Sequence, residues 1–96
     1  MEKKLTRTLE KGLDKVLQGT LEHTYELMNK KFLDLAKSRK DFLFGVVVGN
    51  MLEGLGFCTY GTHKRYPKDD EFKDFFKIIQ RRSKEIQGTV NSILSK

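Results

Sequence analysis

The chain has 96 residues, of which 38% are hydrophobic and 33% are charged, and its formal net charge is +6. This length holds one domain with a modest core, and a charged fraction above the usual value of about 25% indicates extensive solvent-exposed faces. The single cysteine, Cys58, excludes an intrachain disulfide, and the opening residues MEKKLTRTLEKGLDK contain no apolar stretch of signal-peptide type. We therefore expect a cytoplasmic protein and not a disulfide-stapled secreted scaffold.

The basic surplus is spread along the chain. Residues 1–40 carry ten basic and six acidic side chains, residues 41–66 carry two of each, and residues 67–96 carry seven and five. Acids and bases interleave at both ends, as they do on a solvated helix face, whereas a dedicated nucleic-acid surface usually concentrates its basic charge. The charge pattern alone therefore favours exposed helices over nucleic-acid binding.

The first predicted element is a helix over about residues 4–38, a segment without proline. Apolar residues recur there at helical steps, namely Leu5, Leu9, Leu13, Leu17, Leu21, Tyr25, Met28, Phe32 and Leu35. A strict step of four drifts around a helix by about 40° each time, so we expect two neighbouring helices to cover this stripe. A rod of this length would measure about 50 Å. Gly12 and Gly19 lie one heptad apart, and they predict either a close approach by another helix or a break in the rod.

A second, shorter helix is predicted over about residues 41–55, followed by a connector over residues 56–68. Ser38 or Asp41 can cap the start of this helix, and Gly56 is the expected C-terminal stop. Gly61 favours a turn within the connector, and Pro67 disfavours helix at the residue before it.

The apolar stretch from Phe42 to Cys58 resembles a membrane span in length, and Gly45 and Gly49 form a GxxxG pattern. Asn50 and Glu53 fall inside the stretch, and a carboxylate in mid-bilayer costs at least about 2.5 kcal/mol. A helical wheel also separates a polar side from an apolar side, the latter made of Phe44, Val47, Val48, Met51, Leu52 and Leu55. We therefore expect this helix to pack inside a soluble bundle, with membrane association through residues 42–58 as the least favoured interpretation.

A third predicted helix covers about residues 69–95, with Asp69 and Asp70 as cap and dipole partners. Its residues follow a heptad pattern that is apolar except at Ser83, with Phe72, Ile79, Ile86 and Ile93 at one position and Phe76, Ser83 and Val90 four residues after the first three. This pattern predicts a long packing edge of coiled-coil type.

The sequence offers little chemistry. Cys58, His63 and His23 are the metal-ligand types present, but no CxxC or HxxxH spacing joins them, so we predict neither a metal site nor a cofactor. No phosphate cradle or dinucleotide motif can be identified. Cys58 and His63, five residues apart, could in principle form a nucleophile–base pair, but the sequence offers no evident oxyanion hole. We expect no enzyme activity.

Nucleic-acid binding is the alternative function, because cations beside aromatic rings suit a single strand. The predicted contacts are Tyr60, His63, Lys64, Arg65, Tyr66 and Lys68 of the connector, together with Arg81 and Arg82. No helix-turn-helix pattern supports this alternative.

The sequence as a whole predicts an all-α fold of two long antiparallel helices and one shorter apolar helix, completed as a dimeric helical bundle. We expect the apolar stripes to exceed what one chain can cover, so that a second copy completes the fold. The predicted interface between copies consists of Leu5, Leu9, Leu13, Leu17, Leu21, Ile79, Ile86, Val90 and Ile93. The expected function is that of a small interaction or scaffold protein, whose partners are a second copy and another protein.

Overall fold

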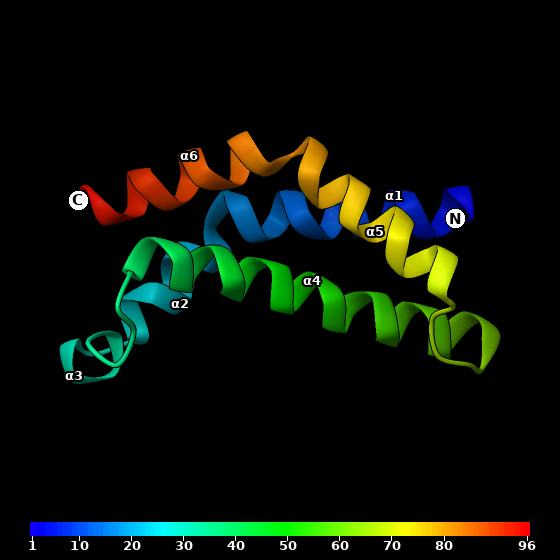
Figure 1. Ribbon diagram of the computed structural model, residues 1–96, viewed down its shortest axis with the longest axis horizontal. Helices are drawn as coiled ribbons and strands as arrows, with labels where there is room; N and C mark the ends of the chain where they lie inside the picture. The colour runs from blue at the N-terminus through cyan, green and yellow to red at the C-terminus, as the bar shows by residue number, and fades with distance from the viewer.

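The computed structural model describes all 96 residues, and the protein is all-helical without any β-strand (Figure 1). Its elements in chain order are α1 (Lys3–Lys15), the π-helical turn η1 (Val16–Thr20), α2 (Leu21–Leu27), α3 (Lys30–Leu33), α4 (Arg39–His63), α5 (Asp69–Arg81) and α6 (Ser83–Leu94). The predicted all-α class is confirmed.

Three arms make up an elongated bundle, in which the middle arm runs antiparallel to the other two (Figure 1). The first and third arms, which contain the two long helices predicted to be antiparallel, therefore run in the same direction. The chain runs along the molecule in α1 and α2, returns in α4, and runs back again in α5 and α6. The protein measures 40 × 23 × 21 Å, and its radius of gyration is 14.2 Å. A compact globule of this length would have a radius of gyration of about 12.5 Å. The elongated shape leaves much of each arm in contact with solvent.

Every arm contributes a line of apolar side chains to one core, and many of these are spaced by four residues. The core consists of Leu5, Leu9, Leu13 and Leu21 from the first arm, Leu43, Val47, Met51 and Leu55 from α4, and Phe75, Ile79, Ile86, Val90 and Ile93 from the third arm. Because a step of four overshoots the helical turn, each buried line winds around its helix, and the arms cross at an angle as they pack.

The nine residues predicted to form an interface between copies lie mainly inside this core. Eight of them are buried within one chain, and Leu17 is half-buried. The expectation that these stripes outrun a single chain is corrected, because α4 is apolar enough to cover α1 and α6 together. Any contact between copies must use a different surface.

The expected first helix, residues 4–38, is divided into shorter pieces. Gly19 leaves the helical conformation at φ 172° and ψ −29°, and Met28 is extended at φ −81° and ψ 129°. The arm therefore stops at the end of the bundle instead of forming the expected rod of about 50 Å. Gly12 does not have the other predicted role, because an added Cβ atom there would lie at an ordinary van der Waals distance of 3.7 Å from the Met51 side chain, and no helix backbone approaches it.

The apolar helix predicted over residues 41–55 is longer than expected, and α4 is the longest helix in the protein. Ser38 caps its start by accepting a hydrogen bond of 3.1 Å from the Asp41 N–H. The helix continues through the expected stop at Gly56 and most of the expected connector, and ends at Lys64 in the left-handed region (φ 56°). Thr59 is fully buried, so packing overrides the weak stop signal of a glycine.

The third predicted helix, residues 69–95, is interrupted at Arg82 (φ −102°, ψ 11°). The break rotates α5 relative to α6, so that Phe75 enters the core with 1% exposure while Phe76, the predicted heptad residue, is 48% exposed. The Arg82 guanidinium bridges the arms: it donates to Glu85 at 2.9 Å, to the Asp14 carboxylate, and to the Glu10 carbonyl at 3.3 Å.

This bridge makes the first testable prediction. Arg82→Ala should lower the free energy of unfolding by about 2 kcal/mol, because the largely buried guanidinium donates several charge-assisted hydrogen bonds. Arg81 is the matched control, since it pairs only with Glu10 and its side chain is 62% exposed. Arg81→Ala should cost less than about 1 kcal/mol. Urea unfolding followed by circular dichroism measures both, and equal losses would contradict the assigned role of Arg82.

Candidate functional site

Helix α4 exposes more apolar surface than its role in the core requires. It is the one helix of the protein that is long and apolar enough, by length and composition, to cross a membrane, but core helices of soluble bundles meet the same criteria. Leu43, Val47 and Leu55 are fully buried against the other arms. Even so, only 28% of the most apolar 18-residue window is buried. The rest of α4 is half-buried or exposed, so the other arms cover its apolar surface only in part.

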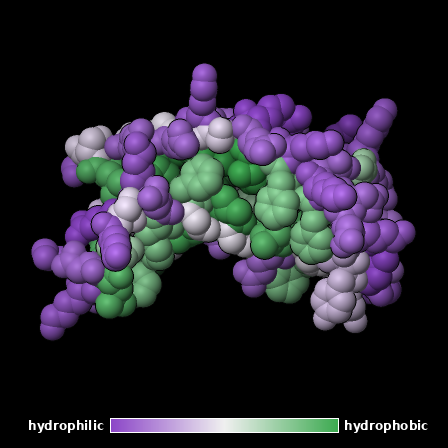
Figure 2. All heavy atoms as spheres, viewed as in Figure 1, coloured by the Kyte–Doolittle hydropathy of each residue, from purple (hydrophilic) through white to green (hydrophobic).

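The exposed side of α4 follows a line of residues spaced by four, which we call the outer ridge: Gly45, Gly49, Glu53 and Phe57. Half-buried apolar side chains flank it, among them Phe44, Val46, Val48 and Leu52. Figure 2 shows apolar side chains gathered over this part of the molecule, whose outline is hollowed between two projecting ends. The first half of the outer ridge, Gly45 and Gly49, therefore has no side chains, whereas the second half ends in the exposed ring of Phe57.

Five of the eight glycines lie in α4, and the bundle gives no reason for them. A Cβ atom added at any of the five would have no heavy-atom neighbour within 4 Å, and none of them has a positive φ. Each glycine inside a helix costs about 0.5–1 kcal/mol relative to alanine. No other part of the chain therefore packs closely on these glycines, and Gly45, Gly49 and Gly61 are exposed.

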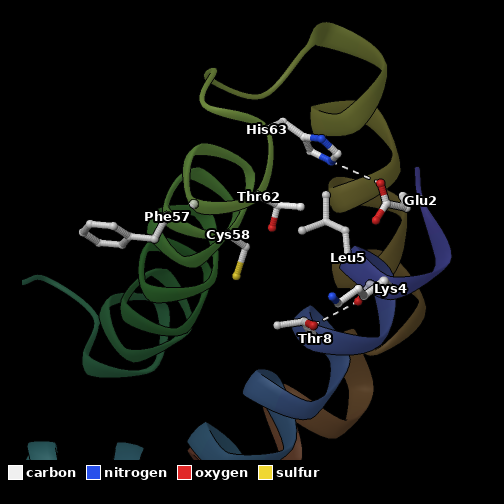
Figure 3. A pocket seen from close by; sticks show the side chains of 9 residues that line it. Glu2, Lys4, Leu5, Thr8, Phe57, Cys58, Thr62 and His63 are labelled. Carbon is white, nitrogen blue, oxygen red and sulfur yellow. Dashed lines mark hydrogen bonds and ion pairs between the residues drawn. The ribbon is translucent and has the colours of Figure 1, made fainter.

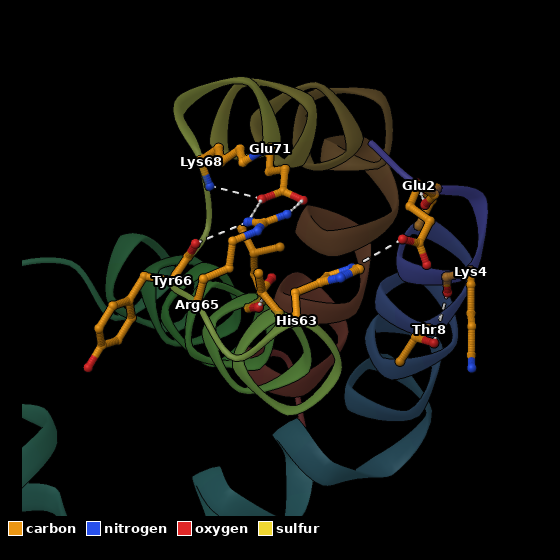
Figure 4. A network of polar contacts seen from close by, with 11 residues as sticks. Glu2, Lys4, Thr8, His63, Arg65, Tyr66, Lys68 and Glu71 are labelled. Carbon is orange, nitrogen blue, oxygen red and sulfur yellow. Dashed lines mark hydrogen bonds and ion pairs between the residues drawn. The ribbon is translucent and has the colours of Figure 1, made fainter.

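A polar network closes the far end of α4, where the chain turns into α5 (Figure 4). Arg65 donates to both carboxylate oxygens of Glu71, at 2.7 and 3.2 Å, and also to the Tyr66 carbonyl at 3.1 Å. The buried Glu71 carboxylate accepts a further bond of 2.9 Å from the Lys68 N–H, which caps α5 in place of the predicted Asp69 and Asp70. Hydrogen bonds from Arg65 and from the Lys68 backbone lower the pKa of Glu71 to about 2.

Most of the basic residues predicted to contact nucleic acid form ion pairs with acidic residues of the same chain. Arg65 is held by Glu71, and His63 lies 3.1 Å from a Glu2 carboxylate oxygen. Arg81 and Arg82 pair with acids of α1, and they lie at the far end of α5, one 13-residue helix (about 20 Å) away from the connector. The structure therefore does not gather the eight predicted residues into one surface.

What remains exposed at the connector is Tyr60, Lys64, Tyr66 and Lys68. The rings of Tyr60 and Tyr66 have centroids 6.0 Å apart. Lys64 and Lys68 are the two cations here without acidic partners. Nucleic-acid binding relies on several basic side chains that each neutralise a phosphate, so two lysines provide little charge for it.

Cys58 and His63 line a small cavity of about 190 Å³ between α4 and α1, together with Glu2, Lys4 and Thr8 (Figure 3). The Cys58 sulfur points toward Thr8, while the His63 ring points toward Glu2. The two side chains share no hydrogen bond, and nowhere do three metal-ligand residues gather. His23 is exposed on α2. The cavity shows no arrangement that would activate the thiol or hold a metal.

Sequence reasoning missed the Arg65–Glu71 pair and the exposure of Leu27 and Leu35, which are 75% and 81% exposed. The ion pair had no helical spacing to reveal it, because its members lie on either side of a turn. Leu35 belonged to a stripe that fits a continuous helix, and the break near Met28 turns it outward, whereas Leu27 was in no predicted stripe.

No family model matches the chain, and neither the comparison with curated proteins nor that with solved structures finds a match. The functional argument therefore depends on the geometry of the exposed surfaces.

The Glu71 network predicts a pH dependence. Because folding lowers the pKa of Glu71 from about 4.5 to about 2, its contribution is complete above pH 4.5 and is lost as the pH falls toward 2. Glu71→Gln should lower the free energy of unfolding by about 2 kcal/mol at pH 7 and make its decline between pH 4.5 and 2 shallower. Urea unfolding across this range provides the measurement. Asp69→Asn, in the same helical turn but exposed, should keep the wild-type slope, and an unchanged slope in Glu71→Gln would contradict the assignment.

Proposed function

We propose that the protein is a non-enzymatic interaction protein of the cytoplasm, and that it self-associates as a homodimer through the outer ridge of α4. The observation that carries the proposal is the set of α4 glycines that meet nothing within their own chain. Their total cost to the helix is a few kcal/mol relative to alanine. A partner that approaches the α4 backbone closely would offset this cost.

The outer ridge is complementary to itself when two copies pair in antiparallel fashion. A two-fold axis between Gly49 and Glu53 places Gly45 of each copy opposite Phe57 of the other, and Gly49 opposite Glu53. The Phe57 ring of each copy then meets Gly45 of the other. The same contact forms twice, as an isologous interface requires. Antiparallel helices also place their dipoles in a favourable orientation. This self-complementarity favours a second copy over an unrelated partner.

The shape of the face supports the same pairing. Residues spaced by four form the ridge type that packs at a crossing angle of about 50°. Along α4 the outline is hollowed between the two ends of the molecule (Figure 2). This hollow leaves room for the α4 of a second copy, and the proposed contact extends along each helix from Gly45 to Phe57.

Gly45→Leu tests the proposal, because a leucine would fill the space for the opposing Phe57 ring. We expect this variant to be monomeric, near the chain mass of 11.2 kDa, under conditions where the wild type has twice that mass. Its fold should become more stable by about 0.5–1 kcal/mol, because the site is open and glycine is a poor helix former. Sedimentation velocity and thermal unfolding measure the two effects.

Gly88→Leu is the matched control, since Gly88 lies in α6 and an added Cβ there also meets nothing within 4 Å. It should gain the same stability and keep the wild-type mass. Glu53→Gln should strengthen the dimer, because both Glu53 carboxylates lie close to the two-fold axis. A wild-type protein that stays monomeric at every concentration, or a Gly45→Leu variant that still dimerises, would contradict the proposal.

A further inference from the structure

The segment from Leu27 to Phe42, which we call the corner, projects from one end of the bundle around α3 (Figure 1). It buries one large apolar side chain, Leu33, and exposes three: Leu27 at 75%, Phe32 at 47% and Leu35 at 81%. A connection between two helices normally needs no such apolar surface. The corner therefore exposes more apolar side chains than it contributes to the core.

Hydrogen bonds, ion pairs and side-chain packing give the corner a defined structure. Asn29 caps α3 by accepting a bond of 2.8 Å from the Phe32 N–H. The Asp34 carboxylate joins the two sides, since it accepts bonds from Lys30 at 2.8 Å and from Arg39 at 3.0 Å. Phe32 packs edge-on against Phe42, with ring centroids 5.9 Å apart. These contacts hold Leu27 and Leu35 in their exposed positions.

Basic charge surrounds the exposed leucines. Lys31, Lys37 and Lys40 are exposed and have no ion pair, in contrast to Lys30 and Arg39, which share Asp34. Besides Asp34, the acids of this region are Asp41 and Glu26, which is exposed and directly precedes Leu27. The corner thus presents an apolar tip with three free lysines beside it.

We propose that the corner docks on the surface of an anionic lipid bilayer, with Leu27, Phe32 and Leu35 entering the headgroup region and Lys31, Lys37 and Lys40 contacting lipid phosphates and carboxylates. Aliphatic side chains at a projecting tip gain by leaving water at the acyl boundary, and lysines beside them reach the headgroups. Anionic lipids of the cytoplasmic leaflet attract each such lysine.

Charge and shape favour a bilayer over the other partners that a basic, apolar surface could bind. A nucleic-acid site needs flat rings for stacking, whereas the two most exposed residues here are leucines. A bound protein helix would need a long groove, whereas the apolar hollow at the corner is short and is lined only by Phe32, Leu35, Ala36 and Phe42. This contact does not involve insertion of α4, whose apolar line stays in the core, and it is independent of the proposed dimer.

Sedimentation with lipid vesicles tests the inference on the full chain. We expect the protein to bind phosphatidylcholine vesicles that contain phosphatidylserine, and not phosphatidylcholine vesicles alone. Leu27→Ser/Leu35→Ser should lower the partition coefficient about tenfold or more. Reversing Lys31, Lys37 and Lys40 to glutamate should lower it about fivefold or more per lysine. Circular dichroism checks that each variant keeps its helix content.

Two controls separate the corner from general effects. Reversing Lys73, Lys77 and Lys84 on α5 and α6 changes the net charge equally, and Phe76→Ser removes an exposed aromatic elsewhere. Both should have little effect on vesicle binding, and Gly45→Leu should still bind. The inference is overturned if no vesicle binds, if both vesicle types bind equally, or if the control lysines matter as much as those of the corner. A random oligonucleotide provides a further check. If it displaces the protein from vesicles, and if Leu27→Ser/Leu35→Ser does not weaken its own binding to the protein, the lysines belong to a nucleic-acid site and the inference is overturned.

Discussion

The structure depends on the burial of a single line of α4 side chains between the two other arms. Leu43, Val47, Met51 and Leu55 recur at every fourth position, and the fully buried Thr59 continues the line, with its hydroxyl donating to the Leu55 carbonyl at 2.7 Å. Neither α1 nor the α5–α6 arm can complete a core alone, because each has an apolar stripe on one side and charges on the other. Helix α4 is the common wall against which both stripes pack. Arg82 adds a polar clamp that fixes the third arm against the first.

The same arrangement explains which surface is left for function. A helix that buries one winding line exposes the line opposite, and in α4 that opposite line is the outer ridge of Gly45, Gly49, Glu53 and Phe57. An ordinary bundle helix would carry charged side chains there, as α1 and α5 do. The absence of side chains at two of the four positions lowers helix stability and allows another backbone to approach. In our account, self-association therefore begins on the outside of α4, whereas the core stripes are fully used within one chain.

The sequence predicted the helical class and the apolar helix faces, because periodic leucines and isoleucines report their own helix face. It assigned nine of these residues to a contact between copies, whereas eight of them are buried in the core of one chain. It did not predict where the long helices break. The conformation of Gly19 and the break at Arg82 depend on where the neighbouring arm ends, which local propensity does not record. The heptad pattern assigned Phe76 to the core since it assumed an unbroken helix, and the rotation at Arg82 selects Phe75. The predicted basic cluster also failed as a unit, because Glu71, Glu2 and Glu10 occupy its cations through contacts that sequence spacing does not reveal.

Disulfide trapping between copies tests the central claim about the outer ridge most directly. In a Cys58→Ser background, chains carrying Gly49→Cys would be mixed with chains carrying Glu53→Cys and oxidised gently, since the antiparallel pairing brings these two positions together and a disulfide requires close Cα atoms. The account predicts that the mixture yields more cross-linked dimer than either variant alone, and that Gly45→Leu in both chains abolishes it. Equal cross-linking in the mixture and in the single variants, or none at all, would show that copies of the protein do not meet through this face.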